Sequence, residues 1–166
     1  NEADRDICSL TFVGLTRFNE YGEVVPQIGT WVISSDGQNY TFKLQAGYRW
    51  HDGVSVTADD VMFTVGMLQA PEFPGRPDIA ALWKTVKAEK TDQDTVVFKL
   101  AEPYAPFLDY TTIGLLPRHI LSGTLPSQLD KIPFNLQPVG NGPWRVTQVG
   151  TSGVRVSSVT LEPIAN

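Results

Sequence analysis

The sequence predicts a mixed α+β fold in which β-hairpins alternate with short helices around a mixed sheet. Apolar and polar residues alternate in several short runs, which is the period of a strand with one buried face. Turn dipeptides rich in glycine and aspartate separate these runs. One longer segment, after Thr57, instead repeats apolar residues at helical spacing.

The clearest strand signal lies at residues 40 to 44. Tyr40, Phe42 and Leu44 alternate with polar residues, which predicts a strand that buries its aromatic face. Residues 31–33 are the predicted hairpin partner, across a loop built around Asp36-Gly37. We expect the Tyr40–Phe42–Leu44 face to lie in the core.

A helix is predicted from Thr57 to the residue before Pro71. Its buried face is marked by apolar residues at helical spacing, Val61, Val65 and Leu68. The Thr57 hydroxyl is placed to reach the backbone amide of Asp60, and the Asp60 carboxylate meets the positive end of the helix dipole. We therefore expect Thr57 to be the N-cap residue.

The remaining elements follow the same two patterns. Strand pairs are predicted for residues 15–18 with 23–25, 86–89 with 95–100, and 145–149 with 154–161. Three short helices are predicted. The first starts at Asp4 or Asp6 and has residues 7, 10, 11 and 14 at helical spacing. The others cover 105–110 and 117–121, the last with Pro117 in its first position. Residues 71–77 and 122–138 are predicted to be loops. The side chains expected in the core from these elements are Val96, Phe98, Trp31, Trp144 and Cys8.

Composition limits the possible partners. The 166 residues are 42% hydrophobic, enough for a real core, and carry a net charge of −5. That acidic balance, with a pI near 4.9, argues against a nucleic-acid surface. No run of about 18 apolar residues is present to span a bilayer. The single Cys8 has no partner for an internal disulfide, and the first residues lack the pattern of an export signal.

No motif for catalysis, metal binding or phosphate binding stands out. His51-Asp52 resembles a catalytic dyad, but no nucleophile elbow accompanies it, and a turn held by His51 is the preferred interpretation. His119, at a helix start, is interpreted as a partly buried polar contact. A hydrolase that uses His51 or His119 remains an alternative. The Gly140-Asn-Gly142 run lacks the lysine of a phosphate loop and predicts a turn.

Metal ligands are likewise not predicted. The two histidines and one cysteine are too scattered for a zinc site. Asp59-Asp60 lacks the alternating ligands of a calcium loop, and the electrostatics of a helix start explain the pair. We expect neither a catalytic residue nor a metal or cofactor.

Seven motifs, in order along the chain, together resemble one family. They are Gly14-Leu-Thr-Arg-Phe18 with Gly22 and Pro26; Trp31-Val-Ile-Ser-Ser-Asp-Gly37; Tyr40-Thr-Phe42 leading to Trp50-His-Asp-Gly53; Thr57-Ala-Asp-Asp-Val61; residues 95–100 with Pro103 and Ala105-Pro-Phe107; Leu116-Pro-Arg-His-Ile-Leu121; and Pro138-Val-Gly-Asn-Gly-Pro-Trp144. This series resembles the family 5 extracellular solute-binding proteins, the ligand receptors of peptide, dipeptide and nickel ABC importers. The departures are mild: Gln45 stands where the family usually has Arg, and Asn141 where it usually has Thr.

The resemblance implies a place in a larger protein. Residues 1–166 would form a partial N-terminal lobe of a two-lobed periplasmic-binding-protein-like fold, either as one unit or as two subdomains with the inserted one over about 38–120, and without the second lobe. The whole protein would act outside the cytoplasm, in the periplasm or as a cell-surface lipoprotein, binding a small solute such as a peptide and delivering it to a membrane permease. One lobe alone should bind its ligand poorly. A domain that only docks the permease is the alternative.

Ligand contacts are expected from two segments by the same resemblance. Phe73, in the proline-rich loop, and Tyr110 would be apolar walls around ligand side chains, and Thr111 a polar contact. The alternative is that Phe73 and Tyr110 pack into the lobe's own core.

Overall fold

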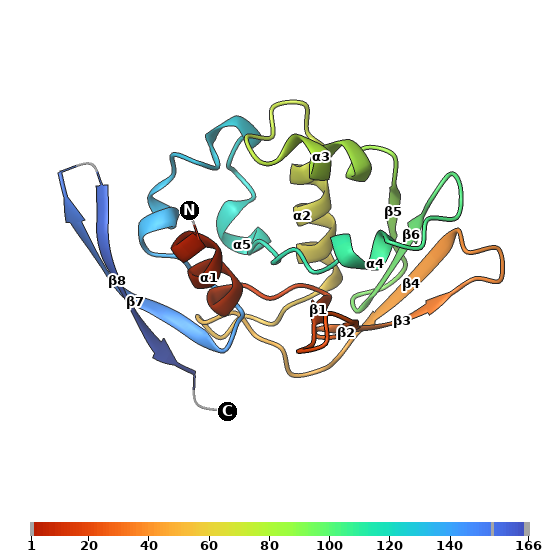
Figure 1. Ribbon diagram of the computed structural model, residues 1–166, viewed down its shortest axis with the longest axis horizontal. Helices are drawn as coiled ribbons and strands as arrows, with labels where there is room; N and C mark the ends of the chain where they lie inside the picture. The colour runs from red at the N-terminus through yellow and green to blue at the C-terminus, as the bar shows by residue number, and fades with distance from the viewer. Residues whose placement is uncertain (1, 154, 165–166) are drawn as a thin grey trace.

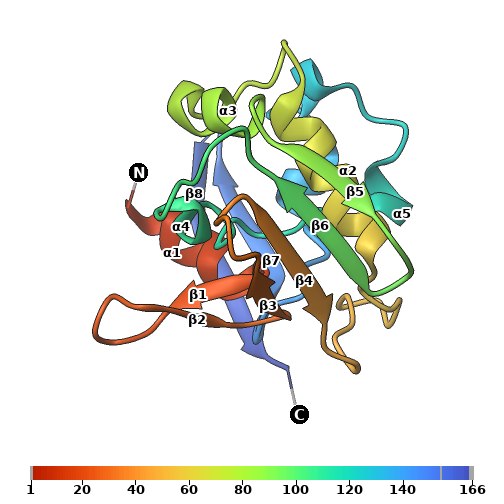
Figure 2. The ribbon, with the colours of Figure 1, turned by 90° about the vertical axis from the view of Figure 1, so that its right-hand side faces the viewer.

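An antiparallel sheet with the strand order β3-β4-β6-β5 forms the centre of the computed structural model, which describes residues 2–153 and 155–164 (Figure 1, Figure 2). Its strands are β3 (Gly29–Ile33), β4 (Asn39–Leu44), β5 (Lys87–Lys90) and β6 (Thr95–Lys99). The long helix α2 (Ala58–Gln69) packs against β5 and β6. The predicted hairpins at 31–44 and 86–100 are therefore confirmed.

The core lies between this sheet and the helices. Phe42 pairs with Val96, and Tyr40 with Phe98, so the aromatic faces of two strands lie side by side. Phe42, Val96 and Phe98 have no exposed surface. The Phe98 ring makes edge-to-face contacts with Phe42 and with Trp83, at centroid distances of 5.6 and 5.3 Å. The predicted aromatic core is confirmed.

Thr57 is the N-cap residue of α2, as predicted, and forms a capping box with Asp60. The buried Asp60 carboxylate accepts hydrogen bonds from the backbone N–H of Thr57 at 2.9 Å and the hydroxyl of Thr57 at 3.4 Å. Its other oxygen accepts the backbone N–H of Arg118 at 3.0 Å. Asp60 thus joins the start of α2 to the start of a second helix.

Several short helices surround the sheet. They are α3 (Pro77–Trp83), α4 (Phe107–Tyr110), α5 (Arg118–Leu121) and the 3-10 helices η1 (Pro126–Gln128) and η2 (Pro133–Leu136). The helix α3 was not predicted, and the two 3-10 turns lie in a segment predicted to be a loop. Pro117 caps α5 instead of occupying its first turn.

The N-terminal helix is displaced from its predicted position. α1 spans Glu2–Thr11, so it begins before Asp4, and Gly14 lies beyond its end. A side chain at Gly14 would meet the backbone oxygen of Ile113 at 2.5 Å, so the chain there lies close against the backbone of another segment. The strands β1 (Thr16–Phe18) and β2 (Val24–Pro26) then form the predicted pair.

A second β region lies apart from the central sheet. The strands β7 (Trp144–Ser152) and β8 (Arg155–Pro163) form the predicted two-stranded hairpin, on the far side of α1 from the sheet (Figure 1). Val154, where the second strand was predicted to begin, lies outside the described residues. No helix in the described part of the chain has both the length and the apolar character needed to cross a bilayer.

Three predicted core positions need correction. Trp144 keeps 36% of its surface exposed, at the start of a two-stranded hairpin that is separate from the central sheet and packs mainly against α1. Trp31 is only partly buried, packing on the Phe42 ring from an edge strand at 6.0 Å. Cys8 is exposed although it lies one helical turn before the buried Thr11, because the two residues border an open hollow between α1 and the hairpin. Trp50 and Trp83, which were not among the predicted core positions, are buried.

Candidate functional site

A hollow of about 220 Å³ lies beside α2, and we call it the α2 groove. Four segments build it: the second half of α2, the loop before α3, the stretch before and through α5, and the residues around η2. Its apolar lining consists of Met67, Leu68, Phe73, Ile113, Gly114, Leu116, Leu121, Leu129, Ile132 and Phe134. The segments are far apart in sequence and meet only in the folded chain.

The polar groups of the α2 groove are already engaged. The Thr64 hydroxyl donates to the Asp60 carbonyl at 2.8 Å and accepts the Leu116 backbone N–H at 2.9 Å. The Asn135 amide donates to the Leu129 carbonyl at 2.8 Å. The lining residues in the described chain include no charged side chain. The groove therefore suits an apolar group of modest size.

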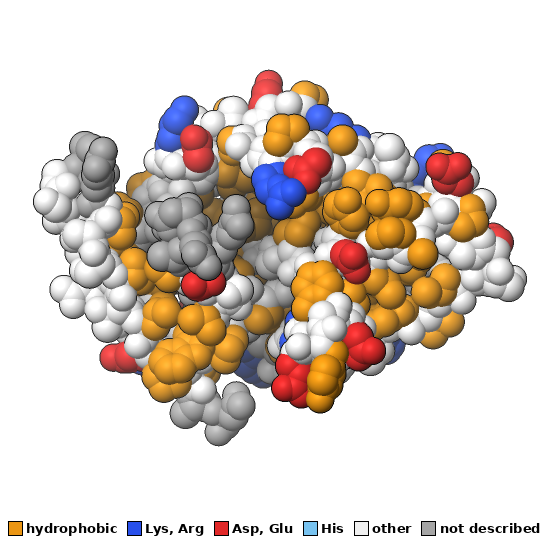
Figure 3. Space-filling model, viewed as in Figure 1, with side chains coloured by type: hydrophobic (Ala, Val, Ile, Leu, Met, Phe, Trp, Pro, Cys, Tyr) orange, Lys and Arg blue, Asp and Glu red, His pale blue; other side chains and the backbone are white. Residues whose placement is uncertain are grey.

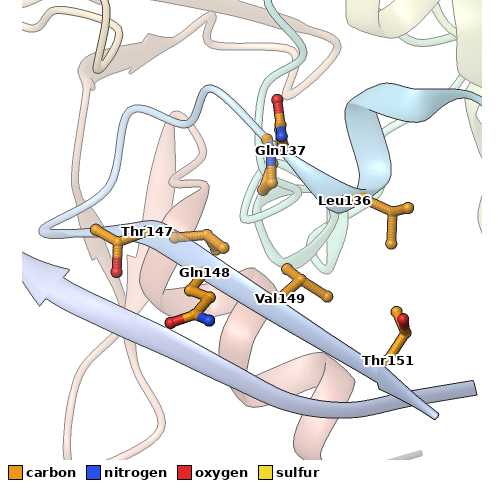
Figure 4. Close-up of a pocket in the computed structure, with 8 residues that line it drawn as sticks. Leu136, Gln137, Thr147, Gln148, Val149 and Thr151 are labelled. Carbon is orange, nitrogen blue, oxygen red and sulfur yellow. The ribbon is translucent and has the colours of Figure 1, made fainter.

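Two further hollows lie toward the hairpin; the second adjoins the groove, and the third shares lining residues with the second. The second, of about 280 Å³, shares Phe134 and Asn135 with the groove and runs between α1 and the β7–β8 hairpin. The Phe12 and Phe134 rings, 6.2 Å apart, lie along this second hollow. Figure 4 shows the third, of about 590 Å³, where Leu136 and Val149 face each other and Gln148 points to the other side of β7.

The predicted contact residues separate in the structure. Phe73 lines the α2 groove and is partly buried against the core. Tyr110 and Thr111 border a small interior space that shares Leu68 and Ile113 with the groove. Tyr110 is half-buried, with its ring 6.3 Å from that of Tyr104. A hydrogen bond with Tyr104 raises the pKa of the Tyr110 hydroxyl.

Thr111 lies deeper than the two aromatic residues. It is buried, and its hydroxyl makes hydrogen bonds of 2.7 Å with the Thr16 hydroxyl and with the Leu108 carbonyl. Apolar side chains also gather at the surface near α4 and the β3–β4 hairpin (Figure 3).

The far wall of the groove was missed by the sequence analysis. Leu129, Ile132 and Phe134 lie in the segment predicted to be a loop. A signal was present, because these apolar residues recur every two or three positions next to Pro133, which is unusual for a solvated loop.

The turn at residues 140–142 lies between η2, which borders the α2 groove, and β7 of the hairpin. A Cβ atom at Gly140 would lie 2.0 Å from the Thr11 carbonyl oxygen, and one at Gly142 would lie 2.3 Å from that of Leu10. Both positions therefore require glycine for close backbone approach. This agrees with the predicted turn and gives its glycines a packing role.

His51 holds the same turn. Its Nδ1 accepts the backbone N–H of Gly140 at 3.2 Å, and its Nε2 lies 2.9 Å from the Gly142 carbonyl oxygen. The neutral tautomer with a proton on Nε2 satisfies both contacts. His51 thus bonds to backbone, as the turn interpretation predicts.

His119 is paired with Asp52, the residue that follows His51 in the chain. Its Nε2 lies 2.7 Å from the Asp52 carboxylate. Burial opposes ionisation of Asp52, but the hydrogen bonds from His119 and from the Val54 backbone outweigh it, so the pKa of Asp52 is lowered. Within the described residues, no three potential metal ligands of the His, Cys, Asp and Glu types gather.

Comparison with known proteins identifies the family. The family model described as bacterial extracellular solute-binding proteins, family 5 Middle, matches residues 23–162. The chain belongs to this family. The oligopeptide-binding protein AppA of Bacillus subtilis is 32% identical over 152 residues, which cover 87% of this chain and 27% of AppA. The dipeptide-binding protein of Escherichia coli is 30% identical over 156 residues, covering 76% of this chain and 27% of that protein.

Solved structures of family members share the fold. AppA of Bacillus subtilis, in complex with a nonapeptide, superposes with a TM-score of 0.88 and 25% identity, over 99% of this chain and 32% of that one. NikZ of Campylobacter jejuni, in complex with Ni(L-His), has a TM-score of 0.75 and 34% identity, over 84% and 28%. The chain spans about a quarter of the length of the curated relatives it matches.

Proposed function

We propose that this chain is part of the substrate receptor of an ABC importer, which binds peptides or similar small solutes outside the cytoplasm and delivers them to a membrane permease. Its family membership over residues 23–162 is the observation that carries the proposal. The role needs binding and release, with no catalytic step and no cofactor. Whether the protein is periplasmic or a cell-surface lipoprotein does not alter this role.

In this proposal the α2 groove holds an apolar side chain of the solute. Phe73 is one wall of the groove, and Tyr110, which borders the adjoining interior space, is a second apolar contact. Thr111 offers a polar contact where its hydroxyl exchanges its hydrogen bond with Thr16 for one with the solute. A second surface, from a lobe outside residues 1–166, would close over the solute, and residues of about 38–120 would act as an inserted subdomain.

The lining favours peptides over a nickel chelate. NikZ was solved with Ni(L-His), a metal complex, whereas the described residues of the α2 groove supply no charged side chain and no histidine. AppA was solved with a nonapeptide, and peptides are a class of ligand that can present an apolar side chain to such a groove. We therefore propose peptides with at least one apolar side chain as the solute class.

Thermal-shift screening of the gene product in its natural length tests this function. A peptide of two to nine residues with an apolar side chain should raise the melting temperature, and nickel–histidine should not. Failure of every peptide to stabilise the protein would contradict the receptor role and favour the alternative of a domain that only docks the permease.

Titration of the stabilising peptide against four variants then tests the residues. Phe73→Ala and Tyr110→Ala should each weaken binding by about tenfold, the loss expected when an aromatic contact is removed from a pocket. Phe18→Ala and Tyr21→Ala are matched controls, since both side chains are at least half exposed on other elements, and they should bind as the parent does. Parental affinity in folded Phe73→Ala and Tyr110→Ala would contradict the assignment of this surface.

A further inference from the structure

Asn141 is 6% exposed and lies in the 140–142 turn, which contacts residues 11–13 and His51. Its Oδ1 accepts the backbone N–H of Val13 at 2.9 Å, and its Nδ2 donates to the Val13 carbonyl at 3.2 Å. One side chain amide therefore satisfies both backbone groups of a residue 128 positions earlier in the chain. Near neutral pH, where carboxyl groups are ordinarily ionised and only accept, a carboxamide is the side-chain group that offers a donor and an acceptor in this planar arrangement.

The backbone of the same turn holds Thr11. The N–H groups of Asn141 and Gly142 both donate to the Thr11 carbonyl, at 3.0 and 2.8 Å. Thr11 and Val13 are thus fixed on either side of Phe12. These hydrogen bonds from the 140–142 turn hold the backbone on both sides of Phe12 and so set the direction of its side chain.

Phe12 in turn supports the α2 groove. Its ring lies 6.2 Å from that of Phe134, which lines the groove. Its Cβ would be 2.7 Å from a Cβ atom built at Gly114, another lining residue. In a close-packed interior, a shift of the Phe12 backbone would therefore displace the groove wall at Phe134 and at Gly114.

We propose that Asn141 is a positioning residue of the solute site, which acts through Val13 and Phe12 to set the wall formed by Gly114 and Phe134. The inference rests on the proposed function, because only a solute makes the groove a binding site. The effect of Asn141 on the groove wall can still be measured without a solute. His51 anchors Gly140 and Gly142 independently, so loss of the Asn141 amide should leave the turn in place.

The variant Asn141→Asp isolates the donor half of the contact. It preserves shape and keeps an acceptor for the Val13 N–H, but at neutral pH it sets a carboxylate oxygen against the Val13 carbonyl. Burial and that carbonyl should raise the pKa of the introduced carboxyl, and protonation restores a donor. Asn141→Thr is the companion variant, because one hydroxyl has a shorter reach and no such recovery.

Methyl-¹³C methionine NMR gives the readout, since Met67 lines the groove and Met62 does not. We expect Asn141→Asp to move the Met67 methyl resonance at about pH 7.5 and return it toward the parent's position by about pH 5, relative to the parent at each pH. Asn141→Thr should move it at both pH values. The Met62 resonance should stay in place throughout.

An unmoved Met67 resonance in folded Asn141→Asp would overturn the proposal, and so would a shift of equal size at Met62. If Asn141→Asp does not fold at neutral pH, Asn141→Thr decides alone, with an unmoved Met67 resonance as the contradicting result. No peptide is present in this experiment, so its failure is separate from a failure of the receptor role.

Discussion

The central β3–β6 sheet and the β7–β8 hairpin are both antiparallel and both carry alternating apolar residues, yet only the sheet has a buried face. Phe42, Val96 and Phe98 of the sheet have no exposed surface. In the hairpin, Trp144 keeps 36% and Val156 keeps 53% of its surface exposed. The same sequence pattern thus has two outcomes in one chain.

The difference lies in what covers each face. The helix α2 packs against β5 and β6, and α3 and α4 place Trp83 and Phe107 against Phe98. Among the described elements, α1 makes the main packing contact with the hairpin, through β7. Alternation predicts that a face can be buried, but a second layer decides whether it is.

The largest expected effect is at the buried sheet. Phe42→Ala should lower the free energy of unfolding by about 3–5 kcal/mol, because it empties a site with no exposed surface. Trp144→Ala, in the hairpin, should cost about 1 kcal/mol or less, since much of the ring already contacts water. Urea unfolding of both variants measures the contrast, and equal losses would remove the distinction between the two regions.

The junction between the two regions should be the next most sensitive. Gly140→Ala places a methyl group on the Thr11 carbonyl and should cost about 2–3 kcal/mol. Gly66→Ala is the control, because Gly66 lies in α2 with open space around its added methyl, and it should gain about 0.5–1 kcal/mol. Destabilisation by both variants to the same degree would mean that the close approach at Gly140 is not the cause.

A smaller effect is expected at the start of α2. Thr57→Ala removes the hydroxyl of the capping box and should cost about 1 kcal/mol, whereas Thr57→Ser should cost very little. Chemical denaturation of the three proteins compares them. Indistinguishable stabilities of Thr57→Ala and the parent would show that the Asp60 carboxylate alone closes this helix end.

The smallest effect concerns Asp52 and depends on pH. Because the pKa of Asp52 is lowered in the folded state, its stabilisation is present above the unfolded pKa of about 4 and is lost as the pH falls through the folded value. Asp52→Asn should therefore be less stable than the parent at pH 6 by under about 1 kcal/mol, since the carboxylate is a third exposed. The difference should shrink as the pH falls below about 4, and a constant difference would exclude the ion pair as its source.

Much of the fold was accessible from local sequence. The hairpins at 31–44 and 86–100, α2 and its N-cap depend on alternation, turn dipeptides and capping, all of which act within a few residues. The helix α3 was missed because its seven residues are too few to show a clear helical period, although Pro77 at its start was a signal. The exposed Trp144 was missed because no local pattern reports the absence of a covering layer.

The candidate site was accessible only in part. Phe73 was predicted from family resemblance and does line the α2 groove. Leu129, Ile132 and Phe134 reach the groove through tertiary packing of an irregular segment, which local periodicity does not describe. The two hydrogen bonds of Asn141 to Val13 join positions too far apart in sequence for any local rule.

The central claim, that the α2 groove binds an apolar side chain of a peptide, is tested most directly by methionine-methyl NMR during a peptide titration. We predict that a phenylalanine-containing tripeptide shifts the Met67 resonance in a saturable way and leaves Met62 unmoved, even where one lobe binds weakly. Phe73→Ala should reduce that shift, and Phe18→Ala should preserve it. A Met67 resonance that no apolar peptide moves, or that moves equally with Met62, would contradict the account.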